Sequence, residues 1–361
     1  MRIKNLKLKN FRNYVDEEVN FSDGLNVLFG RNAQGKTNCA EAVFYLCTGV
    51  SPRSTRDKQL IRHGQECAEI SAIADGRYGG IELYAKITEN GREVKLNGNK
   101  ITKNADILGN IYGIFFSPHE LRLIQDGPDE RRRFLNISIS QLSKPYYVAL
   151  SRYKKILEQR NNLLKEKDLS LVYDTLPVWD EQLSKYAATV AYKRAEFVKS
   201  LAPIANKIHS HLTDGAENLS VSLDKKYKGD EKELEKRFFN EFSSNYDRDI
   251  RLGFTASGPH RDDLDIEIDG TDAKAFASQG QTRTSALSLK LAEVEIFKEI
   301  SGEYPVLILD DVMSELDLPR RKKLVSYTKD LQTILTCTHA ERVLYGSIAN
   351  KIRIEGGKIK Q

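Results

Sequence analysis

One eight-residue segment, residues 30–37, constrains the fold of this chain more than any other. It reads Gly-Arg-Asn-Ala-Gln-Gly-Lys-Thr and fits the pattern G-x-x-x-x-G-K-[ST]. The apolar run of residues 25–29 precedes it, and a helical spacing of apolar residues follows it. Glycines allow the backbone to wrap a phosphate, and the N-terminus of the next helix adds favourable partial charge. The segment therefore predicts a nucleotide-binding loop between a strand and a helix of an α/β fold.

Two side chains of this loop have separate expected roles. Lys36 would reach the β- and γ-phosphates, and the Thr37 hydroxyl would ligate Mg²⁺. Chance matches to the pattern occur in unrelated chains. Here the segment lies between an apolar strand and a helical pattern, as nucleotide binding requires, so we favour nucleotide binding. The expected cofactor-binding residues of the loop are Gly30, Arg31, Asn32, Ala33, Gln34, Gly35, Lys36 and Thr37.

A second signal lies at residues 306–311, which read Val-Leu-Ile-Leu-Asp-Asp. A fully apolar strand that ends in acid is where a carboxylate commonly holds Mg²⁺, directly or through water, and Asp310 takes that expected role. Asp311 follows and would orient the attacking water as general base. The alternative is a strand capped by two solvated aspartates, and the phosphate-binding loop upstream weighs against it.

Three short motifs complete a recognisable order. Residues 278–281 read Ser-Gln-Gly-Gln, residues 314–317 read Ser-Glu-Leu-Asp, and His339 follows a further apolar strand. This order resembles the ABC-type ATPases. The resemblance implies an ATP-dependent homodimer, in which the signature residues of one protomer contact the ATP that the other protomer binds. It also implies that Lys36, Asp311 and His339 act in hydrolysis. The signature residues expected to bind the second ATP are Ser278, Gly280 and Gln281.

Other segments of the chain indicate which branch of the ABC-type ATPases it resembles. Residues 8–14 resemble the first strand and turn of SMC-like ATPases, and the wide spacing between Lys36 and Asp310 leaves room for an insertion. Residues 116–133, 257–263 and 278–283 resemble the RecF family of bacterial recombination mediators. The chain departs from the general ABC pattern at Asp311, where many relatives carry Glu, and at Gln279, where transporters have a second glycine. The shorter carboxylate is consistent with slow hydrolysis.

The expected fold class is α/β: an ABC-type ATPase head built from both ends of the chain, with a mainly helical inserted second domain. Apolar and polar residues alternate near both ends, with hairpin turns at Asn90-Gly91 and Asn97-Gly98, whereas helical spacing prevails in the middle. The predicted domains are residues 1–125 plus 250–361 for the head and residues 126–249 for the insertion.

The charge balance permits a nucleic-acid partner. The 361 residues carry 56 Lys and Arg against 51 Asp and Glu, a net charge of +5. Without interleaved aromatic residues for base stacking, duplex contact is favoured over single strands. For each basic cluster the alternative is a solvated face. Arg12 and Arg160 continue two of the clusters. The expected DNA-binding residues are Lys4, Lys7, Lys9, Arg131, Arg132, Arg133, Arg152, Lys154 and Lys155.

Other features exclude several protein classes. The longest apolar run found, residues 42–47, is far short of the roughly 20 residues that span a bilayer, and the first residues lack the apolar core of a signal peptide. The four cysteines lack the grouping of a disulfide framework or a zinc site. We therefore expect a cytoplasmic, nucleoid-associated protein with no membrane partner.

The resemblance also implies a biological role. ATP would drive head-to-head dimerisation on duplex DNA, gapped DNA or single/double-strand junctions. Weak, DNA-stimulated hydrolysis of ATP would then release the dimer from the DNA. The implied setting is DNA repair, replication-fork maintenance and the SOS response. The implied partner is RecR, with RecO as a second candidate, and through them the protein would help load a recombinase. Two alternatives stay open. An SMC-like structural tether predicts sustained heptads, and a P-loop kinase acting on a small acceptor predicts no dimer.

Overall fold

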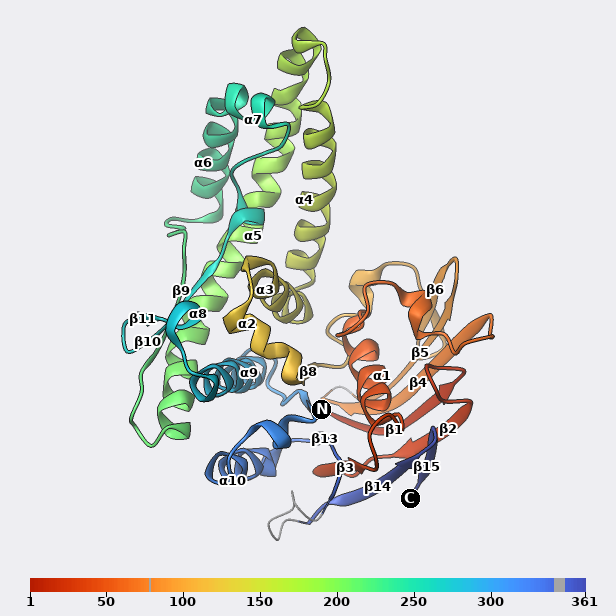
Figure 1. The fold of residues 1–361 in the computed structure, drawn as a ribbon. Helices are drawn as coiled ribbons and strands as arrows, with labels where there is room; N and C mark the ends of the chain where they lie inside the picture. Colours follow the sequence, from red (N-terminus) through yellow and green to blue (C-terminus); the bar gives the residue numbers. More distant parts are fainter. Residues whose placement is uncertain (78, 341–347) are drawn as a thin grey trace. The chain divides into compact units, whose positions relative to one another are not determined.

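The computed structural model describes residues 1–77, 79–340 and 348–361. The chain forms two compact units (Figure 1). Unit 1 comprises residues 1–121, 208–217 and 278–361, and unit 2 comprises residues 122–207 and 218–277. The mixed α/β class predicted from the sequence is confirmed. The units differ from the predicted domain bounds at residues 122–125, 208–217 and 250–277. The last difference arises because β10 (Leu264–Ile268) pairs with β9 (Leu219–Leu223) inside unit 2.

Unit 1 contains a six-stranded antiparallel sheet near the N-terminus, in which alternate residues of the strands are buried. Its turns follow the predicted sites: Thr88 pairs with Gly91, and Leu96 pairs with Asn99. Asn97 and Gly98 both have positive φ, as the two-residue hairpin turn requires. In spatial order the strands are β2 (Asp16–Asn20), β1 (Arg2–Lys9), β4 (Cys67–Gly76), β5 (Gly79–Thr88), β6 (Gly91–Leu96) and β7 (Asn99–Ile101).

The second sheet of unit 1 joins strands that are far apart in the sequence. It is parallel except at its edge, where β15 (Lys358–Lys360) pairs antiparallel with β14 (Asn350–Glu355). Because β13 lies between β3 and β12 and all three run parallel, the loops after these strands emerge at one edge of the sheet. The spatial order is β15 (Lys358–Lys360), β14 (Asn350–Glu355), β3 (Leu25–Phe29), β13 (Thr333–Cys337), β12 (Val306–Asp310) and β8 (Gly113–Phe116).

The helix α1 (Lys36–Thr48) contacts strands of both sheets and is buried over most of its length. It ends at Gly49, whose φ of 70° is the left-handed conformation that often closes a helix. The other helices of unit 1 are α9 (Gln279–Ser301) and α10 (Leu318–Tyr327), and its short 3₁₀ turns are η1 (Asp57–Leu60), η2 (Asn104–Asp106), η3 (Pro118–Leu121), η5 (Val312–Glu315) and η6 (Thr328–Asp330).

Unit 2 is mainly helical, as the spacing of apolar residues in the middle of the chain predicted. Its core joins the long helices α4 (Lys144–Leu163) and α5 (Leu169–Leu212) to α6 (Glu231–Ser244). The core residues that join them are Tyr153, Leu183, Phe238 and Phe242. The small sheet has the order β11-β10-β9. The helices and the remaining short elements are α2 (Arg122–Gln125), α3 (Pro128–Leu142), α4 (Lys144–Leu163), α5 (Leu169–Leu212, of which residues 208–212 are grouped with unit 1), α6 (Glu231–Ser244), α7 (Tyr246–Leu252), α8 (Ala273–Phe276), η4 (Pro259–Arg261) and β11 (Thr271–Asp272).

Over the described part of the chain, none of the helices combines the length and the apolar character that crossing a membrane requires.

Candidate functional site

The loop between β3 and α1 can be built only with glycine at two positions. Gly30 has a φ of 151°, and a Cβ there would lie 2.2 Å from the Ile354 carbonyl oxygen. Gly35 has a φ of 120°, and a Cβ there would lie 2.8 Å from Nδ2 of Asn13. Both φ values lie where residues with a side chain are strained. The two glycines thus allow the backbone cradle that phosphate binding requires.

Lys36 lies inside this loop. Its Nζ donates hydrogen bonds to the carbonyl oxygens of Gly30 at 2.9 Å and Arg31 at 2.8 Å, and the residue is buried. Burial lowers the pKa of Lys36, while the nearby Asp311 opposes that shift. The ammonium is therefore held where the loop would surround a phosphate, as the motif predicts.

Asp310 and Thr37 are brought together from opposite ends of the chain. The Thr37 hydroxyl donates to Oδ1 of Asp310 at 2.8 Å, and the Thr336 hydroxyl donates to the same oxygen at 2.7 Å. Burial raises the pKa of Asp310, and the two hydroxyl hydrogen bonds oppose this effect. Hydroxyl and carboxylate oxygens are the ligands that Mg²⁺ prefers, so this pair fits the ion. Mg²⁺ binding by Thr37 and Asp310 stays a prediction.

Thr336 was missed by the sequence analysis. Its backbone lies on β13, between the strands that end at the loop and at Asp310. Its hydroxyl also accepts a hydrogen bond from the Asp311 backbone N–H at 3.0 Å. The sequence feature that could have indicated this role is the position of Thr336, one residue before the end of β13, a third buried parallel strand.

Asp311 adopts the left-handed conformation, with a φ of 54°, and is exposed. Its carbonyl oxygen accepts a hydrogen bond from the Ser314 hydroxyl at 2.8 Å. Asp tolerates this conformation better than most residues, and such outliers concentrate at functional sites. His339 is also exposed and follows the end of β13, so it lies at the same edge of the sheet. The proposed hydrolytic roles of both residues stay predictions.

The predicted signature residues lie at the N-terminus of α9. Ser278 is the N-cap: its hydroxyl accepts from the Gln281 N–H at 3.2 Å, and the Gln281 side chain accepts from the Ser278 N–H at 2.9 Å. The Gln281 amide also donates to Glu217 at 3.2 Å. Ser278 is exposed, and the nearest atom that a Cβ at Gly280 would meet is the Ser278 hydroxyl oxygen at 3.9 Å, an ordinary van der Waals contact. The structure therefore fixes this turn by local hydrogen bonds and presents it at the surface of unit 1.

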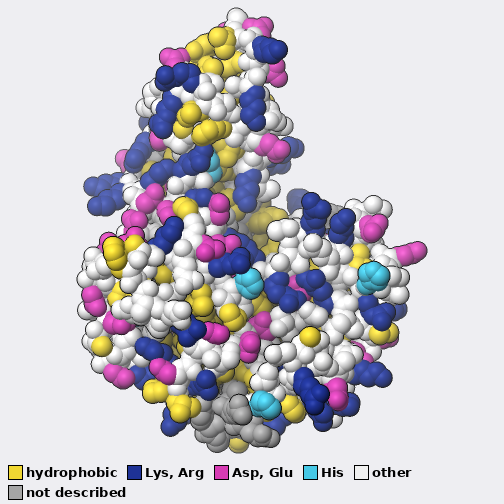
Figure 2. All heavy atoms as spheres, in the orientation of Figure 1, with side chains coloured by type: hydrophobic (Ala, Val, Ile, Leu, Met, Phe, Trp, Pro, Cys, Tyr) yellow, Lys and Arg dark blue, Asp and Glu magenta, His cyan; other side chains and the backbone are white. Residues whose placement is uncertain are grey.

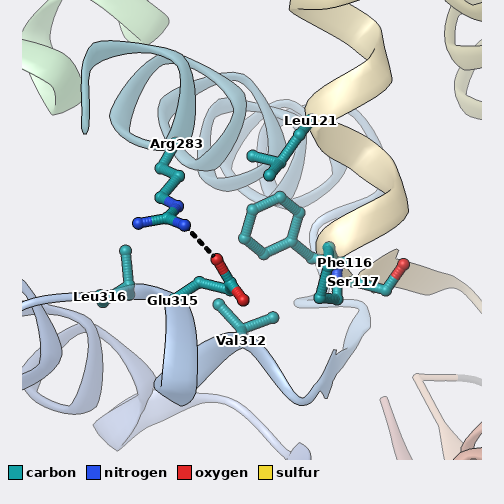
Figure 3. A pocket seen from close by; sticks show the side chains of 8 residues that line it. Phe116, Ser117, Leu121, Arg283, Val312, Glu315 and Leu316 are labelled. Carbon is teal, nitrogen blue, oxygen red and sulfur yellow. Dashed lines mark ion pairs between the residues drawn. The ribbon is translucent and has the colours of Figure 1, made fainter. Parts of the chain in front are cut away.

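A small pocket separates α9 from the Ser-Glu-Leu-Asp segment (Figure 3). Across it, Arg283 of α9 pairs with Glu315, with Nη2 and Oε2 2.6 Å apart. Asp317 caps α10 by accepting a hydrogen bond from the Arg320 N–H at 2.9 Å. The pocket lining consists of Phe116, Ser117, Pro118, Leu121, Arg283, Val312, Glu315 and Leu316.

A polar network beside the phosphate-binding loop is a second feature that the sequence did not predict. The Glu41 carboxylate on α1 is fully buried and accepts hydrogen bonds from Arg12, Arg53 and Ser51. Burial opposes ionisation of Glu41, but these hydrogen bonds together hold its pKa below the usual value. Arg12 therefore belongs to this network, although the sequence placed it in a basic surface cluster. An open pocket of about 550 Å³ adjoins the network and is lined by Arg12, Asn13, Asn38, Arg53, Ser54, Gln59 and Ile61.

The predicted basic surface is only partly available. Arg131 is buried and makes a two-pronged ion pair with Asp263, at 2.5 and 2.8 Å. The expectation that Arg131 contacts DNA is therefore corrected, because its guanidinium is committed to this internal pair. Arg160 is likewise fully buried, between Asp180 and Asp249.

The other predicted cations lie at or near the surface. Four of them have acidic partners: Lys4 pairs with Asp23, Lys7 with Glu18, Arg132 with Asp129 and Arg133 with Glu130. Figure 2 shows Lys and Arg side chains interspersed with Asp and Glu on the visible face. The exposed remainder consists of Lys9, Arg152, Lys154 and Lys155. DNA binding by these residues stays a prediction.

Comparisons with known proteins agree with this geometry. A family model described as the RecF/RecN/SMC N terminal domain matches residues 2–356. A relative from Acetivibrio thermocellus, named DNA replication and repair protein RecF, is 40% identical over 99% of both chains. A relative of the same name from Clostridium acetobutylicum is 40% identical over 100% of both chains.

Solved structures give the same result. A structure of the recombination mediator protein RecF with ATPrS, in the RecFOR pathway, has a TM-score of 0.90 and 32% identity, and covers 99% of this chain and 97% of that one. An Smc head bound to the C-winged helix domain of ScpA has a TM-score of 0.59 at 16% identity, which is a likeness of fold alone, over 100% of this chain and 96% of that one. By its full-length similarity, its phosphate-binding loop and its ABC-type head, this chain belongs to the RecF family of SMC-like ABC-type ATPases.

Proposed function

We propose that this protein binds DNA in an ATP-dependent manner and acts in DNA replication and repair. Two observations outside the site support the role: relatives at 40% identity over the full chain are named for it, and similar RecF structures at 31–32% identity are described with ATP or ATPrS. The observation that carries the ATP dependence is the 2.8 Å hydrogen bond between Thr37 and Asp310. This hydrogen bond connects the proposed phosphate-binding loop with Asp310, the carboxylate that would hold the metal ion.

ATP would bind in the cradle of residues 30–37. Backbone N–H groups at the start of α1 would surround the phosphates, and Lys36 would exchange its carbonyl partners for phosphate oxygens. Thr37 and Asp310 would hold Mg²⁺, which supplies positive charge to the β- and γ-phosphates. Thr336 would orient Asp310 through the hydroxyl hydrogen bond on Oδ1.

Dimerisation would use the exposed turn at the start of α9. Ser278, Gly280 and Gln281 present a helix N-terminus, which favours a negatively charged group, and Gly280 leaves room for close approach. A γ-phosphate bound by a second protomer is such a group. ATP would thereby join two heads, and its hydrolysis would separate them. In this proposal ATP shifts a population of open and closed dimers, because only the closed state makes both sets of contacts.

Hydrolysis would be weak and DNA-stimulated. Asp311 would orient the attacking water, and His339, at the same edge of the sheet, would approach the γ-phosphate. The dimer would hold duplex DNA, gapped DNA or a junction between single and double strands. RecR is the proposed partner through which the complex helps load a recombinase, and RecO is a second candidate partner.

The test is duplex-DNA binding by an Asp311→Asn variant, with and without ATP, across a salt series. The amide keeps the side-chain shape but removes the expected base, so we expect ATP-dependent binding that persists and weakens steeply with salt. Lys36→Ala is the matched control, because it should lose ATP affinity and remain in the weak-binding state. Equal binding of the Asp311→Asn variant with and without ATP would overturn the proposed gating.

A further inference from the structure

Residues 257–263, which read Ser-Gly-Pro-His-Arg-Asp-Asp, form a loop of unit 2 that is held in place by buried polar groups. Gly258 has a φ of 119°, and a Cβ there would lie 2.6 Å from the Tyr153 hydroxyl oxygen. That hydroxyl lies 2.6 Å from Nδ1 of His260, whose Nε2 lies 2.9 Å from the Thr255 carbonyl oxygen. Because the carbonyl can only accept, Nε2 carries the proton and Nδ1 accepts from Tyr153.

A buried ion pair fixes the other side of the loop. Nη1 of Arg194 lies 2.7 Å from Oδ2 of Asp262 and donates to the Pro259 carbonyl oxygen at 2.5 Å. The Tyr227 hydroxyl donates to the second oxygen of Asp262. Arg194 and Asp262 are both buried. Such a pair adds little net stability, since desolvation offsets much of the attraction. Its clear effect here is to fix the backbone of one short loop.

Three cations surround this fixed backbone. Nζ of Lys225 donates to the Gly258 carbonyl oxygen at 3.3 Å, and Nη1 of Arg132 donates to the Asp262 carbonyl oxygen at 2.6 Å. The guanidinium of Arg261 lies over the Phe254 ring, 4.9 Å from its centroid. The three charges act together on His260, whose pKa is lowered to about 4, mainly by burial and in addition by Arg261, Lys225 and Arg132.

Two of these cations have no acidic partner within the described part of the chain. Arg132 pairs with Asp129, whereas no carboxylate among the described residues pairs with Lys225 or Arg261. The acids of the loop itself are neutralised: Asp262 by Arg194, and Asp263 by Arg131. Two further acids of the described residues lie beside the loop: Asp224, whose carboxylate accepts two backbone N–H groups, and Asp265, an exposed carboxylate whose pKa is raised by desolvation and by the nearby charges of Asp224 and Asp263. The positive charges of Arg261 and Lys225 are therefore left without an ion pair among the described residues, and Arg261 is exposed to solvent.

We propose that Arg261 and Lys225 contact the phosphodiester backbone of duplex DNA. The inference rests on the proposed DNA binding and assigns residues to it that the sequence analysis did not select. A guanidinium stacked on an aromatic ring keeps its N–H edge available for two parallel hydrogen bonds to a phosphate. Because the loop is fixed by buried groups, little ordering would be required when the phosphate arrives.

The test measures duplex binding of the full chain with ATP across a salt series, for the original protein, Arg261→Ala and Lys225→Ala. Each phosphate contact contributes about 0.9 to the slope of log affinity against log salt. Each single variant should therefore lower the slope by about 0.9 and weaken binding about fivefold near 0.15 M salt. The double variant should lower the slope by about twice as much. Arg261→Lys should restore most of the slope, because it keeps the charge.

Lys199→Ala is the matched control, an exposed cation of α5 elsewhere in unit 2, and it should keep the original slope. ATP hydrolysis without DNA should be unchanged in all variants, because none of these residues lies at the nucleotide site. Salt curves of the Arg261→Ala and Lys225→Ala variants that overlay the original curve would overturn this inference alone. A protein that binds no duplex at any salt concentration would instead overturn the proposed function.

Discussion

Arg283 on the signature helix and Glu315 in the Ser-Glu-Leu-Asp segment form an ion pair 2.6 Å long. The pair joins the helix whose first turn presents Ser278 to the segment that follows Asp311. Each side chain is about one-third exposed, and Nε of Arg283 is buried without a hydrogen-bond partner among the described residues. Two groups expected to act on different ATP molecules are therefore linked within one protomer.

Removal of this pair should uncouple the two segments. Because solvent screens the charges, Arg283→Gln or Glu315→Gln should cost at most about 1 kcal/mol of unfolding free energy. Urea unfolding of both single variants and the double variant measures the coupling, and the double variant should lose less than the sum of the two. ATP hydrolysis should fall with little change in ATP affinity, since neither residue is in the phosphate-binding loop. Strictly additive losses would contradict a direct interaction.

Changing Gly30 or Gly280 to alanine should impair different properties of the protein: stability in the first case and dimerisation in the second. Gly30→Ala should destabilise unit 1 by about 3 kcal/mol or more, because its φ is strained and its Cβ meets the Ile354 carbonyl. Gly280→Ala should leave the melting temperature nearly unchanged, because the nearest atom that its Cβ would meet is the Ser278 hydroxyl oxygen at 3.9 Å. It should nevertheless impair ATP-dependent dimerisation, measured by sedimentation. A large loss of stability in Gly280→Ala would contradict this distinction.

Arg131 should behave as a structural residue. Arg131→Ala leaves Asp263 without its two-pronged partner and should cost about 3 kcal/mol of unfolding free energy. Arg152→Ala, which changes an exposed cation on α4, should leave stability within about 0.5 kcal/mol. Chemical denaturation of both variants checks the difference. If Arg131→Ala were as stable as the original protein and lowered the salt slope of DNA binding, the earlier surface assignment would be restored.

His260 should make stability depend on pH. Its pKa is lowered from 6.5 to about 4, with burial as the largest cause, so below pH 6.5 the unfolded chain binds a proton that the folded chain does not. Stability should therefore fall as the pH drops from about 6.5 to 4, by at most about 3 kcal/mol. Denaturation at several pH values measures this slope. His260→Gln should be less stable at pH 7 but lose this part of the pH dependence, and an unchanged slope would contradict the assignment.

The parts of the fold predicted from the sequence depend on local patterns. The phosphate-binding loop follows from eight consecutive residues, and the turns at Asn90-Gly91 and Asn97-Gly98 follow from dipeptides that favour positive φ. The buried parallel strand that ends at Asp310 follows from its uninterrupted apolar residues.

The parts that could not be predicted depend on partners distant in the sequence. Arg131 has the same local context as its neighbours Arg132 and Arg133, and only the position of Asp263 makes it a buried residue. Thr336 acquires its role only because β13 lies between β3 and β12. Likewise, Arg12 continues an alternating basic strand, and its partner Glu41 is reached only after α1 has packed.

The assembly of the parallel sheet from distant strands has a consequence for biosynthesis. Thr37 and Asp310 are 273 residues apart, so at 5–20 residues per second the ribosome needs roughly 14 to 55 s to deliver the second after the first. During this interval the nascent chain carries the complete phosphate-binding motif, but β3 has neither β13 nor β14 beside it. A product truncated before β12 would retain the motif and lack the site. ATP can therefore stabilise only chains whose synthesis has passed these strands.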